Sequence, residues 1–201
     1  KKSKARLGMI TTPHGTIRTP AFVPVGTAGS IKSLTPNEIK ACNIDVFFVN
    51  TYHMLFRPGT ETVKKMGGLH NFINWDGPLM TDSGGFQAFS LGEFGPRQQV
   101  QNPEKLVKIT NDGIYFKSVW NGNTAFLGPQ ESIVHQQKLG ADILMAFDEC
   151  TFFPIQKAYA RQALGRTHQW AQLCLDQKRK IVNGQALYGI IQGSVFKDLR
   201  K

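Results

Sequence analysis

The sequence predicts an α/β protein in which a small antiparallel sheet precedes a mainly parallel sheet covered by helices. Two features of the sequence carry this prediction. Residues 1–30 hold short extended runs broken by turns, and the later residues alternate apolar strands with amphipathic helices. Strands that are apolar throughout are typical of parallel sheets with helices on both faces. We interpret residues 1–201 as part of one domain, with residues 1–30 forming the antiparallel sheet.

The opening residues favour extended chain and then a helix. Three extended runs are separated by turns: Gly8–Ile10, Thr16–Arg18 and Ala21–Val25. Runs punctuated in this way by glycine and proline indicate short strands. Further along, Thr35 can cap a helix, Pro36 suits its first position, and Glu38 completes a capping box. We therefore expect a short helix from Pro36, followed by a strand over residues 44–49.

The same alternation continues to the end of the chain. Expected strands cover residues 78–81, 142–147 and 186–191, and a hairpin joins 114–119 to 124–127 through Asn121-Gly122. Expected helices cover residues 60–66 and 131–139. A long third helix places Tyr159, Ala163, Trp170 and Cys174 on one face.

Two architectures fit this order of elements. An interrupted (β/α) barrel explains a chain that stops at Lys201, just inside what resembles another helix. A doubly wound open sheet is the alternative, but the sequence contains no Gly-x-Gly-x-x-Gly fingerprint of the kind such sheets use for dinucleotides.

Composition narrows the class of protein. The net charge of +10 favours a polyanionic partner, nucleic acid above all. Cys42, Cys150 and Cys174 are widely spaced and the five histidines show no ligand spacing, which argues against a disulfide framework and against a zinc site within this span. With no apolar run of membrane length and no secretory signal, we expect no membrane partner and a cytoplasmic location.

Polar residues follow four of the predicted strands. They are Asn50, Asp82, Asp148 and Gln192. Because parallel strands end at the same edge of a sheet, two carboxylates and two amides are expected at one mouth. Such a set suits the recognition of a polar heterocycle and the transfer of protons. The alternative is that each of these residues only caps the turn after its strand.

The segment after Asp82 reads Ser83-Gly84-Gly85-Phe86-Gln87. Paired glycines allow the backbone to approach a ligand closely, and Phe86 could stack on a base. The alternative is a glycine-rich turn beside a core phenylalanine.

Six blocks of the sequence resemble tRNA-guanine transglycosylases, the queuine tRNA-ribosyltransferase family, in the N-terminal half of the bacterial type. They occur in the family's order and span nearly the whole chain: Thr11–Ile17, Pro24–Gly29, Asn50–His53, Thr81–Gln87, Met145–Cys150 and Gly189–Gly193. The resemblance implies a (β/α)8 TIM-barrel type fold, of which only the first part is present. It also implies exchange of the wobble guanine of tRNA for 7-aminomethyl-7-deazaguanine by double displacement, as in retaining glycoside chemistry.

The resemblance also assigns roles to residues. Asp82 would recognise the base and act as the catalytic acid/base, while Asn50 and Thr51 hold it in the empty site. Asp148 and Gln192 would bind the polar edge of the purine, with Ser83 beside them and Phe86 stacked on the ring. Cys150 lies in a Phe-Asp-Glu-Cys block of bacterial type, which favours the aminomethyl base over queuine.

Other parts of the family's machinery are expected outside this chain. The covalent nucleophile and the zinc ligands belong to the family's second half, so this fragment alone should be inactive, with no cofactor bound within residues 1–201. The family commonly forms homodimers. The stretch Glu93–Asn102 is longer than the family norm and is interpreted as a surface loop.

Two other functions remain as alternatives. A barrel glycosidase would use Asp82 and Asp148 as its carboxylate pair, but it should carry sugar-stacking tryptophans near the strand ends. Trp75, Trp120 and Trp170 lie elsewhere in the sequence. A non-catalytic tRNA-binding relative or accessory subunit would be expected to have lost the pocket residues.

Overall fold

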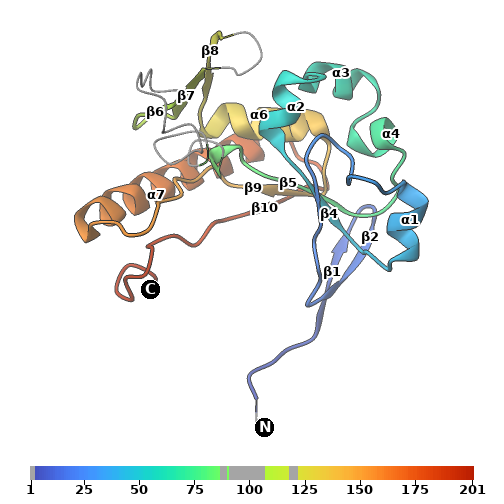
Figure 1. Cartoon of the computed structure of the whole chain (residues 1–201), viewed down its shortest axis with the longest axis horizontal. Helices are drawn as coiled ribbons and strands as arrows, with labels where there is room; N and C mark the ends of the chain where they lie inside the picture. The colour runs from blue at the N-terminus through green and yellow to red at the C-terminus, as the bar shows by residue number, and fades with distance from the viewer. Residues whose placement is uncertain (1–2, 87–89, 91–106, 118–121) are drawn as a thin grey trace. The chain divides into compact units, whose positions relative to one another are not determined.

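The protein is a mixed α/β fold with one five-stranded sheet and two small antiparallel sheets (Figure 1). The structure is a computed structural model and describes residues 3–86, 90, 107–117 and 122–201. The strands are β1 (Gly8–Thr12), β2 (Gly15–Thr19), β3 (Val25–Gly26), β4 (Phe47–Val49), β5 (Leu79–Thr81), β6 (Val107–Ile109), β7 (Ile114–Lys117), β8 (Thr124–Leu127), β9 (Ile143–Met145) and β10 (Ala186–Tyr188). The helices are α1 (Pro36–Ala41), α2 (Thr51–Phe56), α3 (Thr60–Lys65), α4 (Leu69–Ile73), α6 (Pro129–Leu139) and α7 (Lys157–Arg179).

The five-stranded sheet has the order β10-β9-β5-β4-β3. The pairs β3–β4, β4–β5 and β5–β9 are parallel, so the predicted α/β class with a mainly parallel sheet is confirmed. Strands β1 and β2 form an antiparallel hairpin, and β6-β7-β8 form an antiparallel three-stranded sheet. Of the hairpin strands predicted over residues 114–119 and 124–127, the described parts are present as β7 (Ile114–Lys117) and β8 (Thr124–Leu127). Residues 118–121 and Glu93–Asn102 lie outside the described residues.

The chain divides into two compact units. The first unit comprises Lys1–Asp82, His135–Leu144 and Val182–Leu187, and the second comprises Ser83–Val134, Met145–Ile181 and Tyr188–Lys201.

The capping box predicted at the start of α1 is confirmed. The Glu38 amide donates to Thr35 Oγ1 at 3.3 Å, and the Glu38 carboxylate accepts from the Thr35 amide at 2.7 Å. Pro36 occupies the beginning of the helix, where its missing N–H leaves no helical bond unmade. These local signals fix where α1 begins.

Several sequence predictions are wrong. The strands expected over residues 44–49 and 142–147 are shorter, because β4 covers Phe47–Val49 and β9 covers Ile143–Met145. Residues 21–30 do not extend the antiparallel sheet, because β3 pairs in parallel with β4. Prolines at positions 20 and 24 lack an N–H and cannot continue the ladder, and the Pro24 carbonyl instead accepts from the Phe48 amide at 2.9 Å. The last strand ends at Tyr188 rather than at residue 191, and Ile191 is exposed.

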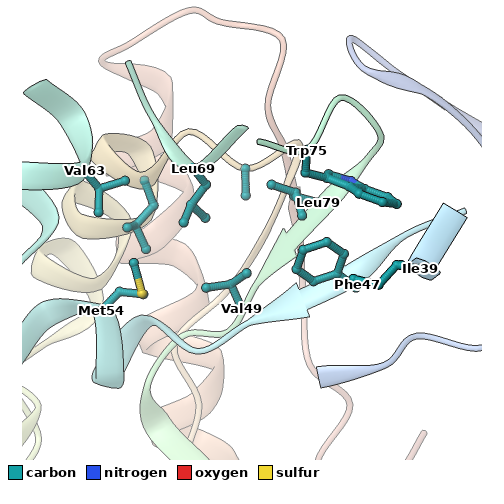
Figure 2. Close-up of a cluster of buried hydrophobic side chains, with 10 residues drawn as sticks. Ile39, Phe47, Val49, Met54, Val63, Leu69, Trp75 and Leu79 are labelled. Atoms are coloured by element: carbon teal, nitrogen blue, oxygen red, sulfur yellow. The ribbon is translucent and has the colours of Figure 1, made fainter. Parts of the chain in front are cut away.

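The main core of the first unit lies between strands β4 and β5 and helices α1 to α4. Figure 2 shows Phe47 and Val49 of β4, Leu79 of β5 and Met54 of α2 directed into this cluster. Along β5 the side chains alternate, so Leu79 enters this core whereas Met80 packs in a second cluster with Ile17 of β2. Both faces of β5 are therefore covered, as the apolar strand sequence requires.

Among the residues that the structure describes, no helix is both long enough and apolar enough to cross a lipid bilayer.

Candidate active site

The four polar residues predicted at strand ends all follow strands of the parallel sheet. Asn50 and Asp82 come directly after β4 and β5, while Asp148 and Gln192 come a few residues after β9 and β10. In the sheet order, β4, β5, β9 and β10 are consecutive neighbours. The carboxyl ends of parallel strands are the usual location of function in α/β folds.

In the first unit, Asp82 is held by the segment that follows β4. Its Oδ2 accepts from Asn50 Nδ2 at 2.5 Å, and its Oδ1 accepts from the Thr51 amide at 2.6 Å. The Thr51 hydroxyl donates to the Asp82 carbonyl at 2.5 Å. Asp82 is 8% exposed. The structure thus brings Asn50, Thr51 and Asp82 together.

The local sequence explains this arrangement. Asn50 is the N-cap of α2, yet its side chain makes no capping bond and donates to Asp82 instead. The Thr51 amide is in the first turn of α2, where backbone N–H groups have no helical partner. Two donors left over by the start of one helix therefore bind one carboxylate.

In the second unit, the Asp148 carboxylate accepts hydrogen bonds from Ser83 and Gln192. Its Oδ1 accepts from Ser83 Oγ at 3.3 Å and its Oδ2 accepts from Gln192 Nε2 at 2.7 Å. Ser83 is itself fixed, because its carbonyl accepts from Ser132 Oγ at 2.7 Å. Burial raises the pKa of Asp148, although the bonds from Gln192 and Ser83 oppose that rise.

The glycine pair after Ser83 brings two backbone segments close together. A Cβ on Gly85 would lie 2.5 Å from the Asp148 carbonyl oxygen, and Gly84 has a φ of +83°. A side chain at position 85 would therefore push the Asp148 segment away. Phe86 follows with 55% of its surface exposed, so it is not the core phenylalanine of the alternative interpretation.

Cys150 is partly buried two residues after Asp148. Burial, with a contribution from the Asp148 charge, raises the pKa of its thiol. Its sulfur therefore remains a neutral, weakly polar group near neutral pH.

Sequence reasoning missed Glu149, which lies between Asp148 and Cys150. Its side chain is 1% exposed and accepts from Arg166 Nε at 2.5 Å and from Arg166 Nη2 at 3.0 Å. The Tyr159 hydroxyl donates to it at 2.7 Å. Burial, reinforced by Glu149, raises the pKa of Tyr159 to about 12. Of these partners, only Tyr159 was on the predicted shared face of α7, so the sequence offered little indication of the contact.

A second missed cluster lies in the first unit around Asp142. This carboxylate accepts from His14 Nδ1 at 2.7 Å and from the Leu79 amide at 2.9 Å, and His70 Nε2 lies 3.4 Å away. The two imidazole rings stack with their centroids 3.5 Å apart. Burial favours a higher pKa for Asp142, but hydrogen bonds from His70, His14 and Leu79 outweigh it and lower the pKa to about 2.

The fold and these residues define an α/β protein with polar side chains after the strands of its parallel sheet. The parallel sheet is followed by the buried Asp82 and the partly buried Asp148. Each carboxylate accepts from an amide side chain, that of Asn50 or that of Gln192.

Comparison with known proteins identifies the family. The family model for queuine tRNA-ribosyltransferase matches residues 1–201, so the chain belongs to the queuine tRNA-ribosyltransferase family. Similar proteins named queuine tRNA-ribosyltransferase occur in Desulforamulus reducens (48% identity over 201 residues), in a Psychrobacter species (46% over 200) and in Shouchella clausii (45% over 203). The matches cover 100% of this chain and 50%, 49% and 50% of those proteins. The chain spans about half the length of the curated relatives it matches.

Proposed function

We propose that this chain is the N-terminal part of a tRNA-guanine transglycosylase that exchanges the wobble guanine of tRNA for 7-aminomethyl-7-deazaguanine. One observation carries the proposal: the family match extends over residues 1–201. The polar residues of the predicted base site lie within the matched residues. The fold proposed for the complete enzyme is a (β/α)8 barrel whose first strands are those of the five-stranded sheet.

Asp82 is proposed as the general acid/base that exchanges a proton with the leaving and entering base. Both of its oxygens accept bonds from Asn50 and Thr51. We propose that the carboxylate exchanges one of these bonds for a bond to the base when the base is present. Asn50 and Thr51 then act as a resting position for Asp82 while no base is bound.

Asp148, Ser83 and Gln192 are proposed to bind the purine. The guanine edge presents two N–H donors and one carbonyl acceptor. The Asp148 carboxylate can accept both N–H groups, and the Gln192 amide and the Ser83 hydroxyl can donate to a carbonyl. Phe86 would stack on the ring, and Cys150 would favour the aminomethyl base.

The proposed macromolecular partner is tRNA. A net charge of +10 supports binding to the phosphates of an anticodon loop. The target base is unpaired there, which lowers the cost of flipping it into a pocket. We further propose a cytoplasmic homodimer, as is common in the family.

Zinc and the covalent nucleophile are proposed to belong to residues outside this chain. His14, His70 and Asp142 offer one possible ligand atom each, all within 4.8 Å of one another. The bond between His14 Nδ1 and Asp142 and the stacking of the two rings at an interplanar angle of 15° account for this arrangement without a metal ion. His70 Nε2 is also within 3.1 Å of the Gly77 carbonyl, to which it donates.

The test uses the complete protein, unmodified tRNA and labelled guanine or 7-aminomethyl-7-deazaguanine. Wild type should place label at the wobble position, and Asp82→Asn should lose most of this activity. Asp176→Asn is the matched control, because Asp176 is exposed on α7, and it should behave as wild type. Binding of tRNA without incorporation by wild type would contradict the proposal and favour a non-catalytic tRNA-binding relative.

A further inference from the structure

The segment that carries Asp148 has no regular secondary structure between β9 and α7. Irregular backbone is not held by a ladder or a helix, so its position depends on individual contacts. Most of the contacts on either side of Asp148 come from α7. The Phe147 amide is bound at 3.3 Å by the sulfur of Cys174, and the Glu149 amide donates to Thr167 Oγ1 at 3.1 Å.

Glu149 is tied to α7 through its side chain as well. Arg166 binds the carboxylate with two nitrogens and Tyr159 donates from its hydroxyl. Tyr159 and Arg166 are seven residues, or about two helical turns, apart and so share one face of α7. Thr167, the next residue, reaches the backbone amide of Glu149 rather than its side chain. Glu149, the residue directly after Asp148, therefore makes four hydrogen bonds to α7.

The pairing of the Glu149 carboxylate with the Arg166 guanidinium fixes the geometry of this contact. A buried carboxylate is costly unless it is paired and its oxygens are hydrogen-bonded. Glu149 meets that condition through a bidentate guanidinium, which has a fixed planar geometry. The pairing with Arg166 therefore fixes both the position and the orientation of the Glu149 carboxylate.

Among the described residues, no charged side chain binds Asp148 in this way. Its two bonds come from neutral groups, Ser83 Oγ and Gln192 Nε2, and in the proposed function both of these groups also face the base. The Asp148 carbonyl oxygen lies close to Gly85, at 2.5 Å from where a Cβ on Gly85 would be.

We propose that Glu149 is a positioning residue for base recognition, which holds the Asp148 carboxylate in place through its bonds to Tyr159, Arg166 and Thr167 of α7. This inference rests on the proposed function. Glu149 does not touch the base; it acts through the peptide that joins it to Asp148. Loss of its anchors should weaken binding of the base and leave binding of tRNA phosphates unchanged.

The test measures kcat, KM for guanine and KM for tRNA in the complete protein. Thr167→Val removes the acceptor of the Glu149 amide at nearly constant volume, whereas Thr167→Ser retains a hydroxyl. Thr167→Val should raise KM for guanine about tenfold and leave KM for tRNA within twofold. Thr167→Ser should restore KM for guanine to near the wild-type value, which a general loss of folding would not allow.

Glu149→Gln is the second variant, in case Thr167→Val does not fold. It keeps the shape of the side chain but leaves the Arg166 charge unpaired, and it should raise KM for guanine by at least as much. Thermal unfolding establishes that each variant is folded at the assay temperature.

Equal rises in both KM values, or unchanged KM for guanine in folded Thr167→Val and Glu149→Gln, would overturn the positioning role while wild-type exchange still supported the proposed function. Absence of exchange in wild type would instead overturn the proposed function, and this inference with it.

Discussion

Strand β9 has an aspartate near each of its ends, and the two are held in opposite ways. Asp142, just before the strand, has a side chain that is 0% exposed and accepts from an imidazole and a backbone amide. Asp148, after the strand, is bound by a serine and a glutamine. Burial acts on both, yet the pKa of Asp142 falls to about 2 whereas the pKa of Asp148 rises.

The difference lies in what the surrounding residues supply. Asp142 has donors enough to offset the loss of water, so its charge stabilises the fold. Among the described residues Asp148 has fewer donors, and in the proposed function the N–H groups of the base would complete the set. In α/β barrels the amino ends of strands usually serve stability and the carboxyl ends serve chemistry, and in the proposed function β9 would follow the same division.

The largest expected effect is on catalysis at Asp148. Asp148→Asn should reduce base exchange at least about a hundredfold, because an amide accepts on one oxygen and turns an NH₂ toward the base donors. Stability at neutral pH should change by less than about 1 kcal/mol, since the variant buries no charge. Exchange assays and urea unfolding of the complete protein measure both. A large loss of stability in Asp148→Asn with activity retained would contradict the proposed role of Asp148 in catalysis.

A somewhat smaller effect is expected on stability at Asp142. Asp142→Asn should lower the free energy of unfolding by about 2–3 kcal/mol, because its NH₂ group would face the donors of His14 or Leu79. Exchange activity per folded molecule should remain within a few-fold of wild type. Asp45→Asn is the matched control, since Asp45 pairs with a largely exposed Arg18, and such surface pairs contribute about 1 kcal/mol at most. Equal losses in the two variants would show that burial of Asp142 adds nothing.

Local signals predicted some of this structure well. The capping box at Thr35 lies within four residues, and the alternation of strands and helices was sufficient for the α/β class. Strand β3 was misassigned because its partner, Phe48–Val49, is distant in sequence and two residues of extended chain carry no signal about which strand they join.

The sequence pointed to some of the polar clusters in the structure and not to others. Asp82 and Asp148 stood out because each follows an apolar strand. Asp142 also borders an apolar strand, but nothing near it in sequence indicates its contact with His14, which is 128 residues away. Glu149 entered the sequence analysis only as part of the Phe-Asp-Glu-Cys block. Its partners are on α7, 10 to 18 residues later in the sequence.

The pH dependence of stability should separate the two aspartates next. The folded pKa of Asp142 is lowered from 3.8 to about 2, so its contribution of about 2 kcal/mol is present above pH 3.8 and is lost as the pH falls toward 2. Asp148 has a raised pKa, so its contribution has the opposite sign and is lost as the pH rises through that pKa. Acid titration of unfolding should therefore be flatter for Asp142→Asn and steeper for Asp148→Asn than for wild type. Parallel curves for all three proteins would contradict the pKa directions.

The smallest expected effect is at His14, the partner of Asp142 in the turn between β1 and β2. Its side chain is 39% exposed, so water can replace part of what His14→Ala removes, and the loss should be about 1 kcal/mol. Because Leu79 and His70 still contact the carboxylate, the core should remain intact while the β1–β2 hairpin opens more often. Native-state hydrogen exchange should show lower protection in Gly8–Thr19 and unchanged protection in the part of α6 around Leu139. A uniform fall in protection would mean that His14 supports the whole first unit rather than attaching the hairpin to it.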